Sequence, residues 1–309
     1  MENDIEELID GLKNPAPSIL YHYTSQQGLL AIINSKTIWA TNIYYLNDSS
    51  EYEYAAKLIQ DVIREYLITP PGSSPSLAAG IPLPTKITPE MLEQMLLESI
   101  RGVISLLTTR YRIYVCSFSE EGDQLSQWRG YCPNGNGFSL GFATSPLQDQ
   151  MVKYSFGLVQ CVYDKNEQTK IVKKIIDKSI IALKSSLGET DGVKISAMLT
   201  EIAASTVGKL FFALSRLKHE TFREEKEWRF VALYNDSQPL PILFREGKYM
   251  ITPYVEIQLA DNQESNKIDR IIMGPTSHKL LAQKATKLLM DSNKIKCDVV
   301  PSKIPYRIL

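Results

Sequence analysis

Strand-like and helix-like segments are mixed along this chain without the regular spacing of repeated strand–helix–strand units. Runs with the alternation typical of strands are 19–24, 37–41, 111–118, 137–143, 154–163, 226–234, 254–259 and 269–273. Segments with helical periodicity separate them, among them 48–66, 89–107 and two helices within 165–218. This irregular mixture predicts an α+β fold with a mixed, mainly antiparallel sheet core and helical insertions, and not a doubly wound parallel sheet.

One segment interrupts the chain clearly. Residues 69–88 contain five prolines and two glycines among serines, a composition typical of a loop or linker. Nothing else in the sequence marks a domain boundary. We therefore predict one domain over residues 1–309, with a loop at 69–88 and a helical insertion at 165–218.

Composition excludes several classes of protein. The formal net charge of −1 gives no electrostatic basis for binding nucleic acid or an anionic membrane. No apolar run approaches the roughly 18 residues that a membrane span needs, and the acidic start, Met1 to Glu7, is the reverse of a signal peptide. The four cysteines lack the spacing of a zinc site. We expect a cytoplasmic protein with reduced thiols.

The segment around His22 is the first candidate site, because it places one of only three histidines between two tyrosines on an expected strand. His22 and Thr24 share one face of that strand, and Tyr21 and Tyr23 share the other. A neutral histidine there can hold a ribose hydroxyl or an amide. Equally, it can be a partly buried residue that donates to a backbone carbonyl. Thr24, followed three residues later by Gln27, also fits a capping box for the next helix.

Two further patterns have a structural as well as a functional reading. Trp128 and Tyr131 lie three apart on an expected helix, where they form either an aromatic wall for a planar ligand or part of the core. The G-x-S-x-G pattern at 137–141 matches a nucleophile elbow, but an elbow requires a helix directly after Ser139. Since the alternation continues to Phe142, we predict a strand and no nucleophile.

Glu227 and Arg229 form the second candidate site. On an expected strand both point to one face, while Trp228 and Phe230 point to the other. A carboxylate fixed in this way suits stabilisation of an oxocarbenium-like centre or a hydrogen bond to a ribose hydroxyl. The alternative is a charged edge in which Glu227 is paired with a cation.

Metal and phosphate-loop chemistry has no support in the sequence. The three histidines are isolated, and no H-E-x-x-H motif or Walker-type glycine loop is present. Asp48 and Glu51 fit another capping box and so have a structural explanation. We therefore predict no metal site.

Taken together, several short motifs resemble a bacterial domain family of unknown function, the DUF2971 family. The motifs extend from about residue 18 to Arg307 and are Tyr21-His22-Tyr23-Thr24, Leu46-Asn47-Asp48, Cys116-Ser117-Phe118-Ser119, Trp128 with Tyr131, and Glu225-Lys226-Glu227-Trp228-Arg229. Members of this family occur in scattered bacterial genomes and mobile elements. The resemblance identifies a family and implies no activity.

A second resemblance, to the ADP-ribosyltransferase fold, does imply one. It is similar in having a strand with a histidine, a helix that opens with Gly-Leu, a further strand, and a late strand with a glutamate. In the histidine-tyrosine-glutamate branch, these residues hold the ribose of NAD, stack on nicotinamide and orient the ribose hydroxyl. The resemblance implies NAD as substrate, with His22 and Glu227 as catalytic residues. The cofactor-binding candidates are then Tyr23, Thr24, Tyr44 (with Tyr45 or Tyr131 as alternatives), Asn47, Trp128, Tyr131 and Arg229. Glu225 is the alternative carboxylate.

Two hypotheses of different classes remain, the first from the fold resemblance and the second from the abundance of aromatic residues without a clean catalytic set. The first is an NAD-using ADP-ribosyltransferase or NAD glycohydrolase, acting as a toxin or as an effector in anti-phage defence. The second is a non-enzymatic module that binds a nucleotide or a protein partner from the same operon. The sequence leaves open whether the chain is an enzyme.

Overall fold

The computed structural model describes most of the chain, in nine segments: residues 15–46, 49–67, 88–110, 112–131, 137–186, 192–234, 240–247, 250–259 and 268–305. Contacts divide the chain into two compact units. The helical unit is built from residues 48–112 and 162–220, and the sheet unit from residues 11–47, 113–161 and 221–309. The expected loop at 69–88 lies outside the described residues except for Thr88.

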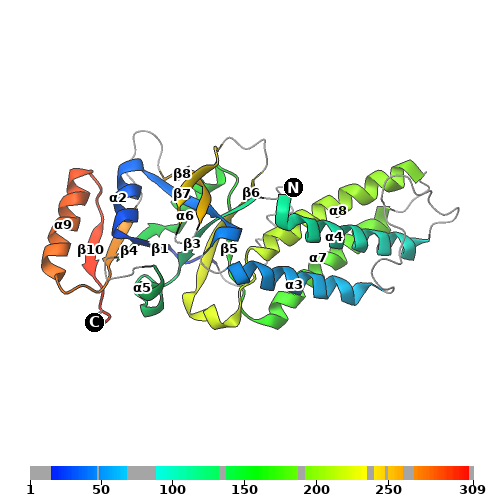
Figure 1. Ribbon diagram of the computed structural model, residues 1–309, viewed down its shortest axis with the longest axis horizontal. Coiled ribbons are helices and arrows are strands. Elements are labelled where there is room, and N and C mark those ends of the chain that lie inside the picture. Colours follow the sequence, from blue (N-terminus) through cyan, green and yellow to red (C-terminus); the bar gives the residue numbers. More distant parts are fainter. Residues whose placement is uncertain are drawn as a thin grey trace. The chain divides into compact units, whose positions relative to one another are not determined.

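The helical unit consists of four long helices that lie side by side (Figure 1). They are α3 (Ser49–Tyr66), α4 (Pro89–Arg110), α7 (Lys165–Ser186) and α8 (Gly192–Leu214). The predicted pair of helices within 165–218 is therefore confirmed as α7 and α8. It shares its unit with α3, which precedes the expected loop, and α4, which follows it.

Helix α8 corrects one expectation from the sequence. Its segment Lys194–Leu214 is long and apolar enough, by length and composition alone, to cross a membrane. Half of that window is buried inside the protein, where Leu210 and Phe211 are among the buried side chains. A buried core helix and a membrane span pass the same test of length and hydropathy, so the expectation that no segment would do so was wrong.

The sheet unit contains a ten-stranded sheet with the order β10-β9-β4-β1-β3-β2-β8-β7, while β6 pairs with β3 and β5. Only β10 and β9 are parallel among the pairings whose registers are resolved; the others are antiparallel. This confirms the predicted α+β class with a mainly antiparallel sheet. The strands are β1 (Ile19–Ser25), β2 (Thr37–Asn42), β3 (Arg112–Ser119), β4 (Gly137–Ala143), β5 (Gly157–Gln160), β6 (Glu227–Tyr234), β7 (Leu243–Glu246), β8 (Ile251–Gln258), β9 (Ile268–Met273) and β10 (Asp298–Pro301).

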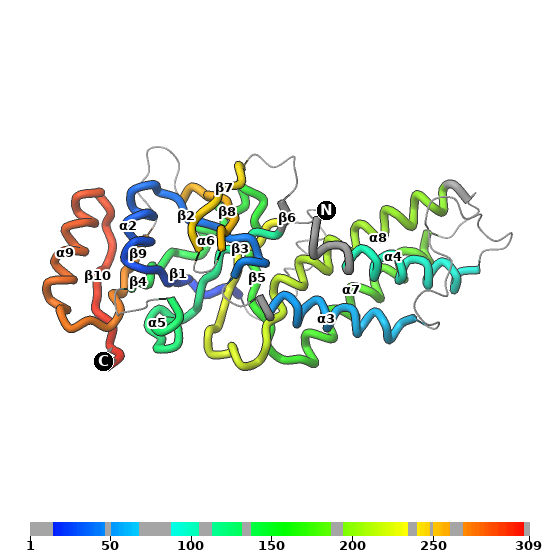
Figure 2. The backbone as a smooth tube through the Cα atoms, in the orientation of Figure 1, coloured from blue at the N-terminus to red at the C-terminus, as the bar shows by residue number. Residues whose placement is uncertain are grey.

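Shorter helices complete the sheet unit, and Figure 2 traces their course. They are α2 (Gln26–Ser35), the 3-10 helix η1 (Ile43–Tyr45), α5 (Leu125–Tyr131), α6 (Thr144–Val152), η3 (Glu220–Glu225) and α9 (Lys279–Ser292). The sequence did not predict α6 or the four-residue strand β7. Pro146 reads as a break, yet it lies in the first turn of α6, where the absence of an N–H costs no hydrogen bond.

The cap of α2 also differs from the expectation. Ser25 and not Thr24 is the N-cap residue, because the Ser25 hydroxyl accepts a hydrogen bond from the Gly28 N–H at 3.1 Å. The helix then begins at Gln26. Thr24 is the last strand residue before the cap, so its side chain belongs to a face of β1.

Strand alternation gives the central sheet two distinct faces. Leu20 of β1, Tyr114, Cys116 and Phe118 of β3, and Phe230 of β6 all belong to one large apolar core. Helices α2 and α6 contribute Leu29, Ile32, Leu147 and Met151 to the same core. On the opposite face, Tyr21 and Tyr23 pack with Trp128 in a smaller cluster. Which face a strand residue occupies therefore decides its surroundings.

Candidate functional site

His22 lies on the core face of β1, at the point where the pairing of β1 with β3 ends. The register of these two strands contains a single pair, Tyr21 with Ser119. Beyond this pair, His22 Nδ1 forms a hydrogen bond of 2.9 Å with the backbone carbonyl oxygen of Ser117. A carbonyl can only accept, so Nδ1 carries the proton. In the neutral ring Nε2 then bears a lone pair, and it has no hydrogen-bond partner among the described residues.

Burial favours that neutral form. Loss of water around the ring lowers the pKa of His22, and the Ser117 carbonyl opposes this shift only in part. The Phe118 ring lies beside it, with a centroid distance of 5.5 Å. His22 is therefore a fixed, uncharged acceptor at neutral pH, which can receive a hydroxyl or amide N–H but cannot hold an anion.

Glu227 and Arg229 form a closed ion pair on β6. Arg229 Nε donates to Glu227 Oε1 at 2.8 Å, and Arg229 Nη2 donates to Glu227 Oε2 at 2.9 Å. The exposed fractions are 5% for Glu227 and 3% for Arg229. Both carboxylate oxygens are thus engaged in a buried bidentate pair, the stable arrangement for two charges away from water.

The structure does not bring His22 and Glu227 together, because they point to opposite faces of the sheet. The Phe118 ring contacts the His22 ring and lies 5.5 Å from the Phe230 ring, which puts these three side chains on one face. Glu227 is three residues from Phe230 on β6, so alternation turns it to the other face. Glu225, the alternative carboxylate, is the last residue of η3, where its backbone carbonyl accepts from the Ser119 hydroxyl at 2.8 Å.

The aromatic candidates on the other face of β1 have structural partners. The Tyr23 hydroxyl donates to the Glu121 carbonyl at 2.7 Å, and its ring meets the edge of the Trp128 ring at 4.8 Å. The Trp128 indole donates to Asp123 at 2.8 Å, and its exposed fraction is 1%. At the end of α5, Tyr131 is 37% exposed. The part of the expected aromatic wall at Trp128 is therefore buried.

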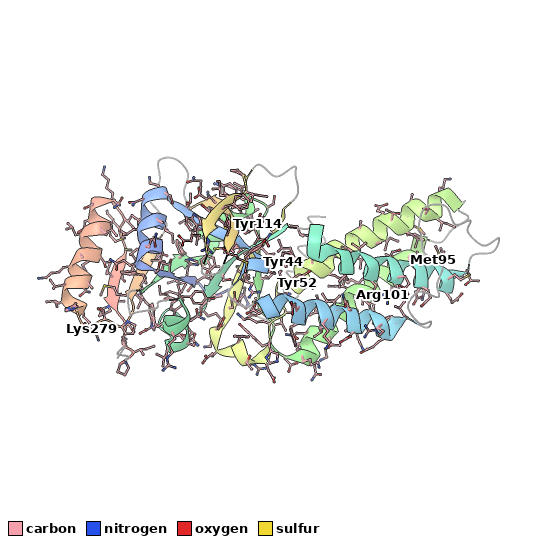
Figure 3. The ribbon with its side chains drawn as sticks, viewed as in Figure 1. Tyr44, Tyr52, Met95, Arg101, Tyr114 and Lys279 are labelled. Carbon is pink, nitrogen blue, oxygen red and sulfur yellow. The ribbon has the colours of Figure 1, made fainter. Side chains whose placement is uncertain are left out.

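The remaining candidates are scattered. Tyr44 lies in η1, where its backbone N–H donates to the Asn42 side chain at 3.1 Å (Figure 3). Asn47 lies outside the described residues. Ser139 lies within β4, which continues to Ala143, so the predicted strand in place of a nucleophile elbow is confirmed. Among the described residues, no three His, Cys, Asp or Glu side chains come together to hold a metal ion.

A cluster that sequence reasoning missed lies on β2, β7 and β8. Trp39 of β2 is paired with Glu256 of β8, and its indole N–H donates to that carboxylate at 3.1 Å. Its ring lies 4.5 Å from the Tyr254 ring and 5.8 Å from the Arg245 guanidinium carbon. Strands β7 and β8 follow β2 by about 200 positions in the chain, so no local motif could reveal the cluster. Only the pairing of β2 with β8 in the folded sheet brings its residues together.

Comparison with family models assigns part of this chain. Residues 127–230, from α5 to β6, match the model described as a protein of unknown function, DUF2971. Residues 127–230 form a DUF2971 family domain. This match confirms the family resemblance for that segment, which contains Trp128, Glu227 and Arg229, whereas His22 and Trp39 lie before it. Comparison with curated proteins finds no match. The DUF2971 description gives no activity, so the roles of the candidate residues stay predictions.

Proposed function

We propose that this DUF2971 protein binds NAD or a related ribonucleotide through His22 and acts as a binding module. The observation that carries the proposal is the fixed tautomer of His22, in which the Ser117 carbonyl holds Nδ1 and leaves Nε2 as a neutral acceptor. Ribose hydroxyls and the nicotinamide amide are donors that suit such an acceptor. The expected cytoplasmic location and defence role belong to the same proposal.

The likeness to the ADP-ribosyltransferase fold is part of this proposal. It is supported by the order of β1 with its histidine, helix α2 and strand β2 at the start of the sheet unit. It is also supported by β3, which pairs with β1, β2 and β6. A strand has only two edges, so two of these three partners must pair with different parts of the same edge of β3. The sheet is therefore split between those two partner strands.

A binding module is favoured over a transferase because Glu227 is not available to a ligand on the face of His22. Cleavage of the glycosidic bond of NAD needs a carboxylate near the developing charge of the ribose. Here both oxygens of Glu227 are held by Arg229. A transferase would have to break this buried pair and bring a carboxylate to the other side of the sheet.

Calorimetric titration with NAD and with ADP-ribose tests the binding. The wild-type protein should bind, and His22→Ala should weaken the affinity by about tenfold, the value of one lost hydrogen bond to a polar ligand. His22→Gln keeps an acceptor and should lose less. The matched control is His278→Ala, because His278 is exposed at the start of α9. Equal affinity of the wild-type protein and a folded His22→Ala variant would overturn the proposal.

A second assay, of nicotinamide release, distinguishes a binding module from a transferase. Purified wild-type protein incubated with NAD should release no nicotinamide. If it does release nicotinamide, and a folded Glu227→Gln variant does not, the transferase reading holds and the binding module is wrong. The double variant Glu227→Met with Arg229→Met removes both charges of the pair, so it checks that any loss comes from the carboxylate and not from the buried charge of Arg229.

A further inference from the structure

The side chains around Trp39 form a polar and aromatic cluster, which we name the tryptophan patch: Trp39, Thr41, Arg245, Tyr254 and Glu256. Trp39 is exposed, Arg245 and Glu256 are half-buried, and Thr41 and Tyr254 are buried. Registers put them on one face of three adjacent strands, since Trp39 is paired with Glu256, Thr41 with Tyr254, and Arg245 with Thr252. Figure 2 shows β7 and β8 beside β2. Ile38, Ala40, Val255 and Ile257 turn the other way, into the core.

Arg245 has one donor without a partner among the described residues. Its Nε is buried and makes no hydrogen bond to any of them. Its Nη2 lies 3.4 Å from the Thr41 hydroxyl, a long and weak contact. No carboxylate of the described residues pairs with it. Burial lowers the pKa of Arg245, while the nearby Tyr254 opposes that shift. The guanidinium carbon lies 5.8 Å from the centre of the Trp39 ring. A guanidinium that has lost water and has no carboxylate partner among the described residues suits an oxyanion.

Trp39 and Glu256 complete the chemistry of the patch. Trp39 is 36% exposed, whereas Trp128 and Trp228 are 1% and 0% exposed. Because its indole N–H is bound to Oε1 of Glu256, the part of Trp39 left to a ligand is ring surface. Glu256 keeps Oε2 for a donor. It also repels a bare anion, so a suitable ligand carries hydroxyl or amino donors beside its negative group.

We propose that the tryptophan patch binds a nucleoside monophosphate. The phosphate accepts from Arg245, the base lies against the Trp39 ring, and a sugar hydroxyl or base amino group donates to Glu256. Stacking of a base on an aromatic ring and bidentate binding of phosphate by arginine are established modes of recognition. An acidic peptide would supply the anion but no planar group for Trp39.

This site goes beyond the binding proposed for His22, because the two lie on opposite faces of the sheet. Thr41 of β2 is paired with Val115 of β3, so their side chains share a face. Val115 is three residues from Phe118, which faces the His22 ring. Alternation therefore separates the tryptophan patch from His22, and one nucleotide cannot contact both.

Tryptophan fluorescence tests the proposal directly, since Trp39 is the most exposed of the three tryptophans. Adenosine and guanosine monophosphates should quench the emission with saturation. Inorganic phosphate and adenosine, which each lack half of the ligand, should bind about tenfold more weakly or worse. Arg245→Met should reduce monophosphate affinity by about tenfold or more, and Arg245→Lys, which keeps charge but loses the fork, should lie between.

Two control variants distinguish monophosphate binding at the tryptophan patch from the NAD binding proposed for His22. Arg223→Ala removes an exposed arginine elsewhere in the sheet unit and should leave the quenching curve unchanged. His22→Ala should also leave it unchanged, even if NAD binding is lost. Absence of saturable monophosphate binding, or wild-type affinity in a folded Arg245→Met variant, would overturn the site. So would loss of the quenching in His22→Ala with retention in Arg245→Met.

Discussion

Arg229 and Arg245 lie in the same sheet unit and have opposite surroundings. Arg229 on β6 is 3% exposed, and its guanidinium makes two hydrogen bonds to Glu227. Arg245 on β7 has a buried Nε without a partner among the described residues, a long contact to Thr41, and a position over the Trp39 ring. The first charge is paired with a carboxylate, whereas the second has no carboxylate partner among the described residues. A closed pair fits a structural role, whereas an open donor beside an exposed tryptophan fits recognition.

The closed pair should give the largest effect on stability. Glu227→Ala removes the bidentate partner of the buried Arg229 charge, so the free energy of unfolding should fall by about 3–5 kcal/mol. Urea denaturation followed by circular dichroism measures this. The double variant Glu227→Met with Arg229→Met should recover most of the loss, because no charge then remains buried. A loss below about 1 kcal/mol in Glu227→Ala would show that the pair is not the tight unit described for β6.

His22 should give the next largest effect, and it depends on pH. Its pKa is lowered in the folded protein, whereas in the unfolded chain it is about 6.5. Below that value the unfolded chain binds a proton that the folded protein does not. The contribution of His22 to the free energy of unfolding is therefore complete above about pH 6.5. As the pH is lowered below that value, this free energy decreases by up to about 1.4 kcal/mol per pH unit, until the pKa of the folded protein is reached.

Denaturation curves of the wild-type protein and of His22→Gln at several pH values between about 5 and 8 check this prediction. The variant cannot titrate, so the part of the slope that His22 causes should vanish. Parallel slopes for the two proteins would mean that the ring is protonated in the folded state. Nε2 would then be a donor, and the proposed acceptor role would fail with it.

Much of the fold follows from local sequence patterns. Alternation identified β1, β2, β4 and β6, and helical periodicity identified α3, α4, α7 and α8. The misses have local causes: Pro146 hid the start of α6, and β7 is too short for its alternation to be evident. Adjacent hydroxyl residues hid the cap of α2, since Thr24 and Ser25 both suit that position.

The candidate site was less accessible to sequence reasoning. The scarcity of histidine drew attention to His22, and alternation correctly placed Glu227 and Arg229 on one face. The relation between faces of different strands depends on register, which no local pattern carries. Hence the sequence could not show that His22 and Glu227 point apart, nor that Trp39 meets Arg245 and Glu256 from distant strands.

Removal of Arg245 should change the free energy of unfolding much less than removal of Arg229. Arg245→Met deletes a partly buried charge that has no carboxylate partner among the described residues, so unfolding free energy should stay within about 1 kcal/mol of the wild type or rise. Arg229→Met, which removes the bidentate partner of the buried Glu227, should lose about 3–5 kcal/mol. Thermal and urea denaturation of both variants measure the contrast. Equal large losses would make Arg245 a structural residue and weaken the tryptophan patch as a site.

The smallest expected effect tests whether an unpartnered buried atom by itself signals function. The Ser139 hydroxyl on β4 also lacks a hydrogen-bond partner within the part of the chain that the structure describes, and the residue is fully buried. Unlike Arg245, it carries no charge and has no exposed aromatic ring beside it. Ser139→Ala removes the unsatisfied hydroxyl, so stability should be unchanged or rise by up to about 1 kcal/mol, measured by urea denaturation. Binding of NAD and of monophosphates should not change, and a loss of either affinity would show that an open polar atom matters even without charge or access.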